Sequence, residues 1–227
     1  MKKSISLFLF AFIILILPLT LAVNLDVQKS SSDEVMIIDL NKPAVFDLSI
    51  KNNGQTDTFM IYTIFGSGYL PQEKFTINSG QTKNIQFIVS PPYDVARTGP
   101  VVFSYFIKGA DNSEYENKLN VNAINLNGAF EIGSADFDPE SSSVEIYIKN
   151  KINFNFENLN VKFSSNFFTL DKSFSLAPKE TKKFQITLDK EQFKKLTAGF
   201  YTINAEIIAE GKTANVDGVM KFAEKNN

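Results

Sequence analysis

The chain has 227 residues, of which 44% are hydrophobic and 21% are charged, and its net charge is −2. This composition is typical of a folded protein and excludes a disordered chain or a strongly basic nucleic-acid binder. The sequence contains no His, Cys or Trp. Classical triads, thiol chemistry, haem, iron–sulfur centres and zinc sites with nitrogen or sulfur ligands therefore lack their usual residues. We accordingly expect no disulfide bond, no cofactor and no enzymatic activity.

Residues 1–22 have the three-part layout of a secretory signal peptide. Two lysines follow the first Met, an apolar run ends at Pro18, and Thr20 and Ala22 place small residues at the −3 and −1 positions of a cleavage site. The alternative is an uncleaved anchor, because residues 4–22 approach the length of about 20 residues that spans a bilayer. In either case we expect the rest of the chain to lie outside the cytoplasm, secreted or at the cell surface.

Beyond this segment the sequence contains one pattern twice, at a spacing near 99 residues. The separation between matching residues increases slightly along the chain. One-residue insertions in loops have this effect, and they reduce stability only a little. The pattern predicts two related domains, residues 23–126 and 127–223, and a frayed tail at 224–227. The boundary falls at an Asn-Gly turn signal near 125–128 and is too short to let the domains swing freely. The matching residues are Ile50-Lys51-Asn52 with Ile148-Lys149-Asn150, Phe75 with Phe174, Thr82-Lys83 with Thr181-Lys182, Gln86 with Gln185, Gly99 with Gly199, and Ile107 with Ile207.

Each predicted domain is a series of short segments in which apolar and polar residues alternate. Period-two alternation with one polar face is typical of antiparallel sheet. About seven such strands per 100 residues, separated by Asn, Gly and Ser turn signals, predict an all-β immunoglobulin-like sandwich in each domain. In chain order, the apolar positions are Phe46, Leu48 and Ile50; Ile85, Phe87 and Val89; Val101, Phe103, Tyr105 and Ile107; Leu119, Val121 and Ala123; Val144, Ile146 and Ile148; Leu159, Val161 and Phe163; and Phe184, Ile186 and Leu188.

Two connections are expected to differ between the domains. In the second domain, Asp189 is a candidate cap for a short helical turn that packs Phe193 and Leu196 and ends at Gly199. The equivalent stretch of the first domain, 91–100, is rich in proline and is expected to cross between the sheets as an extended loop.

The repeated unit resembles a known family. Each copy has a strand that ends in Lys-Asn, then a strand with a central Thr-Lys, then a Gly followed by a long alternating strand. This order resembles the tandem extracytoplasmic immunoglobulin-like repeats of the NEW3 and CARDB-like kind in archaeal and bacterial surface proteins. The resemblance covers nearly all of residues 23–223 and rests on turn and core residues. It implies a spacer, adhesion or assembly role at the cell surface, and it implies no catalytic residue.

Aromatic side chains at predicted loops and strand ends are the candidate partner-binding residues. A sticky patch for a protein partner at the cell envelope is one hypothesis for the rings of the second domain. The alternative is that these rings close the ends of the sandwich or fill the seam between the domains, since a small sandwich without disulfides needs aromatic burial. Two tyrosines in predicted loops are candidates for stacking on a glycan. The residues are Phe154, Phe156, Phe167, Phe168, Tyr69 and Tyr93.

Asp136, Asp138 and Glu140 place three carboxylates within five positions. Calcium needs six to eight oxygen ligands, and such a run can begin a site. The spacing is not that of an EF-hand, however, and no Gly permits the sharp turn. A solvated strand end is the interpretation that we favour, and we assign no metal site.

Three functional hypotheses follow. The first is an exported, non-enzymatic cell-surface protein that acts as a structural spacer or a protein-interaction module. The second is a lectin-like or adhesive module that uses Tyr69, Tyr93 or the loop at 167–168. The third is a pilus-type assembly chaperone, which the size of two tandem domains permits. Such chaperones hold a carboxylate with paired basic residues, and the single arginine of this chain, Arg97, fits that poorly. The mild negative charge predicts no general binding to nucleic acid or to anionic lipid.

Overall fold

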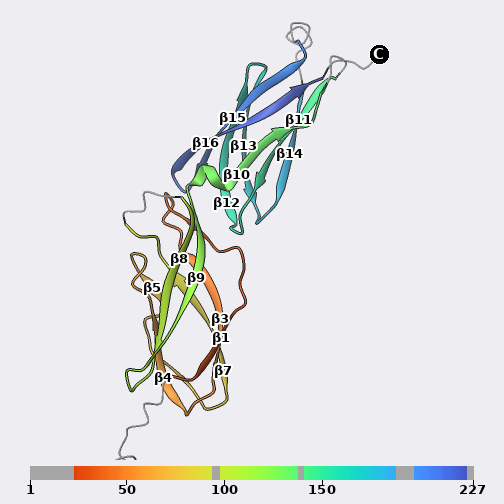
Figure 1. Cartoon of the computed structure of the whole chain (residues 1–227). Helices are drawn as coiled ribbons and strands as arrows, with labels where there is room; N and C mark the ends of the chain where they lie inside the picture. Colours follow the sequence, from red (N-terminus) through yellow and green to blue (C-terminus); the bar gives the residue numbers. More distant parts are fainter. Residues whose placement is uncertain (1–22, 94–97, 138–140, 188–196, 224–227) are drawn as a thin grey trace, which may run out of the picture.

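The computed structural model describes residues 23–93, 98–137, 141–187 and 197–223. Within these residues the chain is nearly all β, with sixteen strands and one short 3-10 helix, η1 (Figure 1). The all-β prediction is therefore confirmed. We call the part that contains β1 to β9 the N-terminal half and the part that contains β10 to β16 the C-terminal half. The expected signal segment, the helical turn at 189–196 and the tail at 224–227 lie outside the described residues.

The N-terminal half consists of two sheets that enclose a buried cluster. One sheet has the strand order β1-β3-β7-β5, and the other has the order β2-β9-β8-β4-β6. The largest side chains that these sheets bury include Phe46, Phe87 and Tyr105. The strands are β1 (Leu25–Lys29), β2 (Val35–Ile37), β3 (Ala44–Asn52), β4 (Asp57–Tyr62), β5 (Tyr69–Leu70), β6 (Phe75–Ile77), β7 (Thr82–Val89), β8 (Gly99–Lys108) and β9 (Glu114–Ile124).

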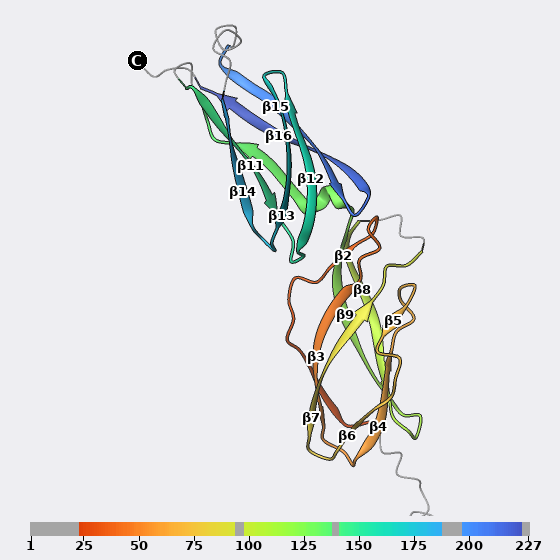
Figure 2. The same cartoon turned by 180° about the vertical axis from the view of Figure 1, so that it is seen from behind.

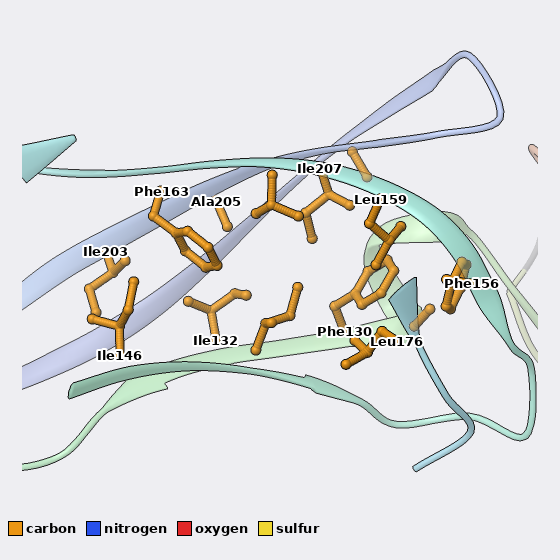
Figure 3. Close-up of a cluster of buried hydrophobic side chains, with 14 of the residues drawn as sticks. Phe130, Ile132, Ile146, Phe156, Leu159, Phe163, Leu176, Ile203, Ala205 and Ile207 are labelled. Atoms are coloured by element: carbon orange, nitrogen blue, oxygen red, sulfur yellow. The ribbon is translucent and has the colours of Figure 1, made fainter. Parts of the chain in front are cut away.

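The C-terminal half is a single sheet with the order β13-β12-β15-β16-β10-β11-β14. It encloses a second buried cluster, in which residues from opposite sides point toward one another (Figure 3). The rings of Phe174 on β13 and Phe184 on β14 lie 5.3 Å apart, so the two edge strands come together. The elements are η1 (Leu126–Ala129), β10 (Phe130–Ser134), β11 (Ser143–Asn150), β12 (Phe156–Ser165), β13 (Phe168–Leu176), β14 (Thr181–Thr187), β15 (Gly199–Ala209) and β16 (Lys212–Phe222).

The alternation in the sequence corresponds to burial along the strands. In β3, Phe46, Leu48 and Ile50 are buried, while the residues between them are partly or fully exposed. In a pleated strand successive side chains point to opposite faces, so this alternation places one face on the core and leaves the other in water. The same alternation holds in β11 and in the central part of β12.

The repeat in the sequence reappears as equivalent strand pairing. Ile50 on β3 lies opposite Lys83 on β7, and Ile148 on β11 lies opposite Lys182 on β14. These are the residues that the sequence repeat matches. The strands β8 and β9 and the strands β15 and β16 likewise form equivalent antiparallel pairs.

Between the halves, η1 occupies the predicted boundary. The strand β9 ends at Ile124, and β10 begins at Phe130. The division of the chain at residue 126 into two domains stays a prediction. Tyr69 lies in the short strand β5 instead of a loop. The strand β2 is one of several that the alternating segments did not indicate, the others including β1, β4, β6, β10, β13 and β16.

Candidate functional site

The seam where the two halves meet brings together segments that lie far apart in the sequence. The backbone N–H of Leu126 in η1 donates to both carboxylate oxygens of Asp39, each at 2.9 Å. Asn125, the residue before η1, gives no side-chain cap to this helix. The Asp39 carboxylate therefore satisfies a backbone donor at the start of η1, as a capping side chain does from within its own helix.

Apolar side chains continue across the same seam. Ile37 on β2 and Ile124 at the end of β9 belong to the buried cluster of the C-terminal half, together with Leu126 and Ala129 of η1. Figure 2 shows β2 at the end of the N-terminal half that faces the C-terminal half. The residues that join the halves are thus part of a core. Since that burial would be lost if the halves separated, the seam resists opening.

Charged side chains surround this apolar contact. Lys42 Nζ lies 2.7 Å from Glu210 Oε2 and 5.8 Å from the centroid of the Phe154 ring. Lys179 Nζ lies 3.8 Å from Asp33 Oδ2. Each of these pairs joins one half to the other, and each is partly exposed, so each adds little stability by itself. Together they favour one relative orientation of the halves.

The four predicted phenylalanines pack against the buried cluster of the C-terminal half. Phe156 is itself a buried member of that cluster, with its ring centroid 4.7 Å from that of Phe130. Phe154 packs edge-on against Phe156 at 4.9 Å and lies at the seam beside Lys42. Phe167 and Phe168 are partly buried at the β12–β13 turn. All four rings thus lie against this core, and Phe154 also lies at the seam.

The two predicted tyrosines have different environments. Tyr69 packs against the core of the N-terminal half, with its ring 6.2 Å from that of Phe87. Tyr93 is 91% exposed. Of the six predicted partner-binding residues, Tyr93 is the one that remains free to contact another molecule through its whole ring.

An exposed ring that the sequence analysis missed lies on the C-terminal half. Phe200 on β15 is 75% exposed and lines a depression of about 570 Å³. Phe200 follows Gly199 and lies opposite Lys221 on β16. The alternation of β15 could have revealed it, because Phe200 falls on the same face as the polar positions. The other residues that line this depression are Ser164, Ser165, Asn166, Tyr201, Thr202 and Asn204.

A larger groove of about 700 Å³ lies at the end of the N-terminal half opposite the seam. It is bordered by residues 23–24 at the start of the described chain, by residues 52–57, and by the turn between β8 and β9. This turn contains Asp111, whose Oδ1 accepts hydrogen bonds from the N–H and hydroxyl of Ser113. These two hydrogen bonds hold the pKa of Asp111 below its ordinary value.

Of the three carboxylates that were considered for calcium, Asp136 alone lies within the described residues. Asp136 is exposed, and its Oδ2 lies 3.2 Å from Lys221 Nζ. Asp138 and Glu140 lie outside the described residues, as does Arg97. Among the residues that the structure describes, no group of three or more metal-ligating side chains comes together. In that same part of the chain, no helix has the length and apolar character needed to cross a membrane.

Comparisons with known proteins identify no family. No protein-family model and no curated protein matches this chain. Among solved structures, a FixG-related protein from Vibrio parahaemolyticus matches with 8% identity and a TM-score of 0.37, over 44% of this chain and 94% of its own. Red sea bream transglutaminase matches with 8% identity and a TM-score of 0.37, over 89% of this chain and 31% of its own. The CupB2 chaperone of Pseudomonas aeruginosa matches with 11% identity and a TM-score of 0.28, over 84% and 98%. At this level of similarity, none of them supports an argument about the function of this chain.

Proposed function

We propose that this chain is an exported, non-enzymatic cell-surface protein that acts as a structural spacer or a protein-interaction module. The observation that carries the proposal is the seam. Ile37 and Ile124 of the N-terminal half are buried in the core of the C-terminal half, and Asp39 holds the first N–H of η1. A spacer must keep its ends apart, and a buried connection does this better than a flexible linker.

The composition and the leader pattern support the remaining parts of the proposal. Residues 1–22 have the layout of an export signal, and the sequence has no His or Cys with which to build the commonest nucleophilic sites. A protein partner at the envelope is the expected ligand of a spacer, and Tyr93 and Phe200 are the most exposed aromatic side chains among the described residues.

The spacer role is tested by measuring the distance between the halves. Because the chain has no native Cys, spin labels can be attached at Glu116→Cys on β9 and Lys172→Cys on β13, both exposed positions. Electron–electron double resonance on this doubly labelled chain is expected to give a single narrow distance distribution. A broad distribution extending over tens of ångströms would contradict a rigid spacer.

The surface location is tested separately on intact cells that produce the full chain. A maleimide that does not cross membranes is expected to label Glu116→Cys without lysis. Labelling that requires lysis would contradict exposure at the cell surface.

The second candidate function is a lectin-like or adhesive module, and the depression that Phe200 lines favours it. An exposed ring beside hydroxyl and amide side chains suits a sugar, since the ring stacks on the apolar sugar face and the polar groups bond its hydroxyls. Binding to a glycan array that Phe200→Ala abolishes and Val102→Ala leaves unchanged would support this function. A blank array at high protein concentration would remove it.

A further inference from the structure

The groove at the end opposite the seam contains two carboxylates close to one residue of the N-terminal segment. Asp57 Oδ2, Asp111 Oδ1 and Val23 Cγ2 lie 2.7, 3.2 and 3.3 Å from a single point, the position that a Cβ on Gly109 would occupy. The α-nitrogen of Val23 is three bonds from this methyl carbon. The side chain of Val23 therefore lies beside two acidic side chains that come from different parts of the chain.

Neither carboxylate has a cationic partner among the described residues. Asp57 accepts hydrogen bonds from the N–H of Thr58 at 2.7 Å and of Ala110 at 3.3 Å. Asp111 accepts from Ser113. All of these donors are neutral, and no ion pair described for the chain includes either residue. Each carboxylate has lone pairs left, so two negative charges face the groove without compensation.

The backbone beside the groove is held in place. Val23 is partly buried against the core of the N-terminal half, and Leu25 is a buried member of that core. The carbonyl of Asn24 accepts a hydrogen bond of 2.9 Å from the N–H of Asn53. Val23 is also the residue that directly follows the predicted cleavage site after Ala22. The residue that would gain a charged α-amino group on cleavage is therefore held next to the groove.

We propose that removal of residues 1–22 creates an α-ammonium group on Val23 that binds in this groove as the ionic partner of Asp57 and Asp111. The cleavage consumes one water, breaks the Ala22–Val23 peptide bond, and leaves a carboxylate on Ala22 and an amine on Val23 that takes up a proton near neutral pH. A leader peptidase of the export pathway is the class of enzyme required. The inference rests on the export part of the proposed function and goes beyond it: processing would complete an ion-pair site and fasten the edge strand β1.

The physical consequence is a change in the new terminus itself. An ordinary α-amine titrates near neutral pH, and opposite charges within about 4–6 Å favour its charged form. Bound between the two carboxylates, this amine is expected to have a raised pKa and to react more slowly with reagents that attack only the neutral form. The chain from Val23 onward includes every described strand, so the effect can be measured on that product.

The experiment uses a removable N-terminal tag that leaves Val23 as the first residue. The rate of reductive methylation of the α-amine is followed by mass spectrometry across a pH series. Near pH 7.5 we expect the reaction to be about fivefold slower than in the double variant Asp57→Asn, Asp111→Asn, with the midpoint of the pH profile moved upward. Asp171→Asn, an exposed carboxylate on β13, is the control and should leave the rate and midpoint unchanged.

A chain with one extra Gly before Val23 gives a second test that leaves the groove intact. The extra residue moves the ammonium away, so this chain is expected to react like the double variant. Equal rates and equal midpoints in all forms would overturn the inference. Sequencing of the N-terminus recovered from cells must also give Val23, and any other terminus would overturn it as well. Neither result bears on the rigidity of the seam, whereas a broad distance distribution would contradict the spacer role and leave the ammonium site standing.

Discussion

Each half of the chain buries one asparagine at the end of a strand, and the two make equivalent hydrogen bonds. Asn52 donates to the carbonyls of Gln55 and Ile77 and accepts from the N–H of Gly54. Asn150 donates to the carbonyls of Phe154 and Ala177 at 2.6 and 2.8 Å and accepts from the N–H of Ile152 at 3.1 Å. Only an amide supplies two donors and an acceptor at this size, which explains why the repeated Lys-Asn motif ends in Asn.

Replacing Asn150 with Ala is expected to lower the free energy of unfolding by about 2–4 kcal/mol, because one buried donor and two acceptors lose their partner. Urea denaturation followed by circular dichroism measures the change. Asn120→Ala, at an exposed position of β9, is the control and should stay within about 0.5 kcal/mol of the wild type. A loss at Asn150 no larger than in the control would show that the buried amide does not hold this turn together.

Glu34, just before β2, is expected to make stability depend on pH. Burial alone would raise its pKa, but hydrogen bonds from Lys29, Ser31 and its own backbone, with the charge of Lys29, together hold this pKa below its ordinary value of 4.5. The lowered pKa means that the folded state favours the deprotonated form. The stabilisation is therefore present above pH 4.5 and disappears as the pH falls through the folded pKa.

Comparing the wild type with Glu34→Gln by urea denaturation at several pH values tests this expectation. The wild type should be the more stable at pH 7, and the difference should shrink steadily below pH 4.5. A difference that is the same at pH 7 and pH 3 would contradict the assignment.

At the scale of elements, one glycine, Gly218 on β16, allows β10 and β16 to lie side by side. These strands pair in parallel at Gly133 and Val219. A Cβ on Gly218 would collide with the carbonyl oxygen of Ile132 and would lie 2.7 Å from its carbonyl carbon. Since the obstacle is backbone, no change of rotamer can relieve it. The contact joins the two groups of strands into the continuous sheet of the C-terminal half.

Gly218→Ala is therefore expected to force β10 away from β16 and to lower the free energy of unfolding by about 2 kcal/mol. Gly68→Ala is the matched control, because a Cβ there meets nothing within 4 Å. Thermal unfolding monitored by circular dichroism compares the two variants. Equal midpoints would show that the strands can separate without cost.

The longer alternating strands were predictable from sequence, whereas several other strands and the seam were not. The alternation of Phe46, Leu48 and Ile50 encodes a buried face directly, because side chains in a strand repeat every two residues. By contrast, β2 has three residues, too few for a pattern. Its neighbour Asp39 binds Leu126 across 87 positions, a contact that no local signal encodes. The alternation of β15 could reveal the exposed ring of Phe200 but not the depression beside it, since residues of both β12 and β15 line that depression.

The same limit explains the outcome for the predicted aromatic site. A Phe near a turn has the same sequence pattern whether its ring faces water or covers the end of a core. Phe154 and Phe167 cover the core, the former against Phe156 and the latter against Tyr201. Burial of such a ring depends on the strands that happen to pass beneath it, and these are set by the topology of the whole sheet.

At the scale of the whole molecule, the two halves lie end to end and the seam decides whether they move as one body (Figures 1 and 2). Three kinds of contact act there: the apolar contact through Ile37 and Ile124, the Asp39–Leu126 hydrogen bonds, and the ion pairs of Lys42 and Lys179. The Asp39 contact is the one that a single substitution removes without opening a cavity in the core.

Asp39→Ala leaves the N–H of buried Leu126 without its acceptor. We expect a loss of about 1–3 kcal/mol in the free energy of unfolding and a broader distance distribution between labels at positions 116 and 172. Asp26→Ala, an exposed position on β1 away from the seam, is the control and should leave the distribution narrow. A distribution as narrow in Asp39→Ala as in the control would mean that apolar packing alone fixes the halves. In that case the carboxylate would not set the stiffness on which the spacer role depends.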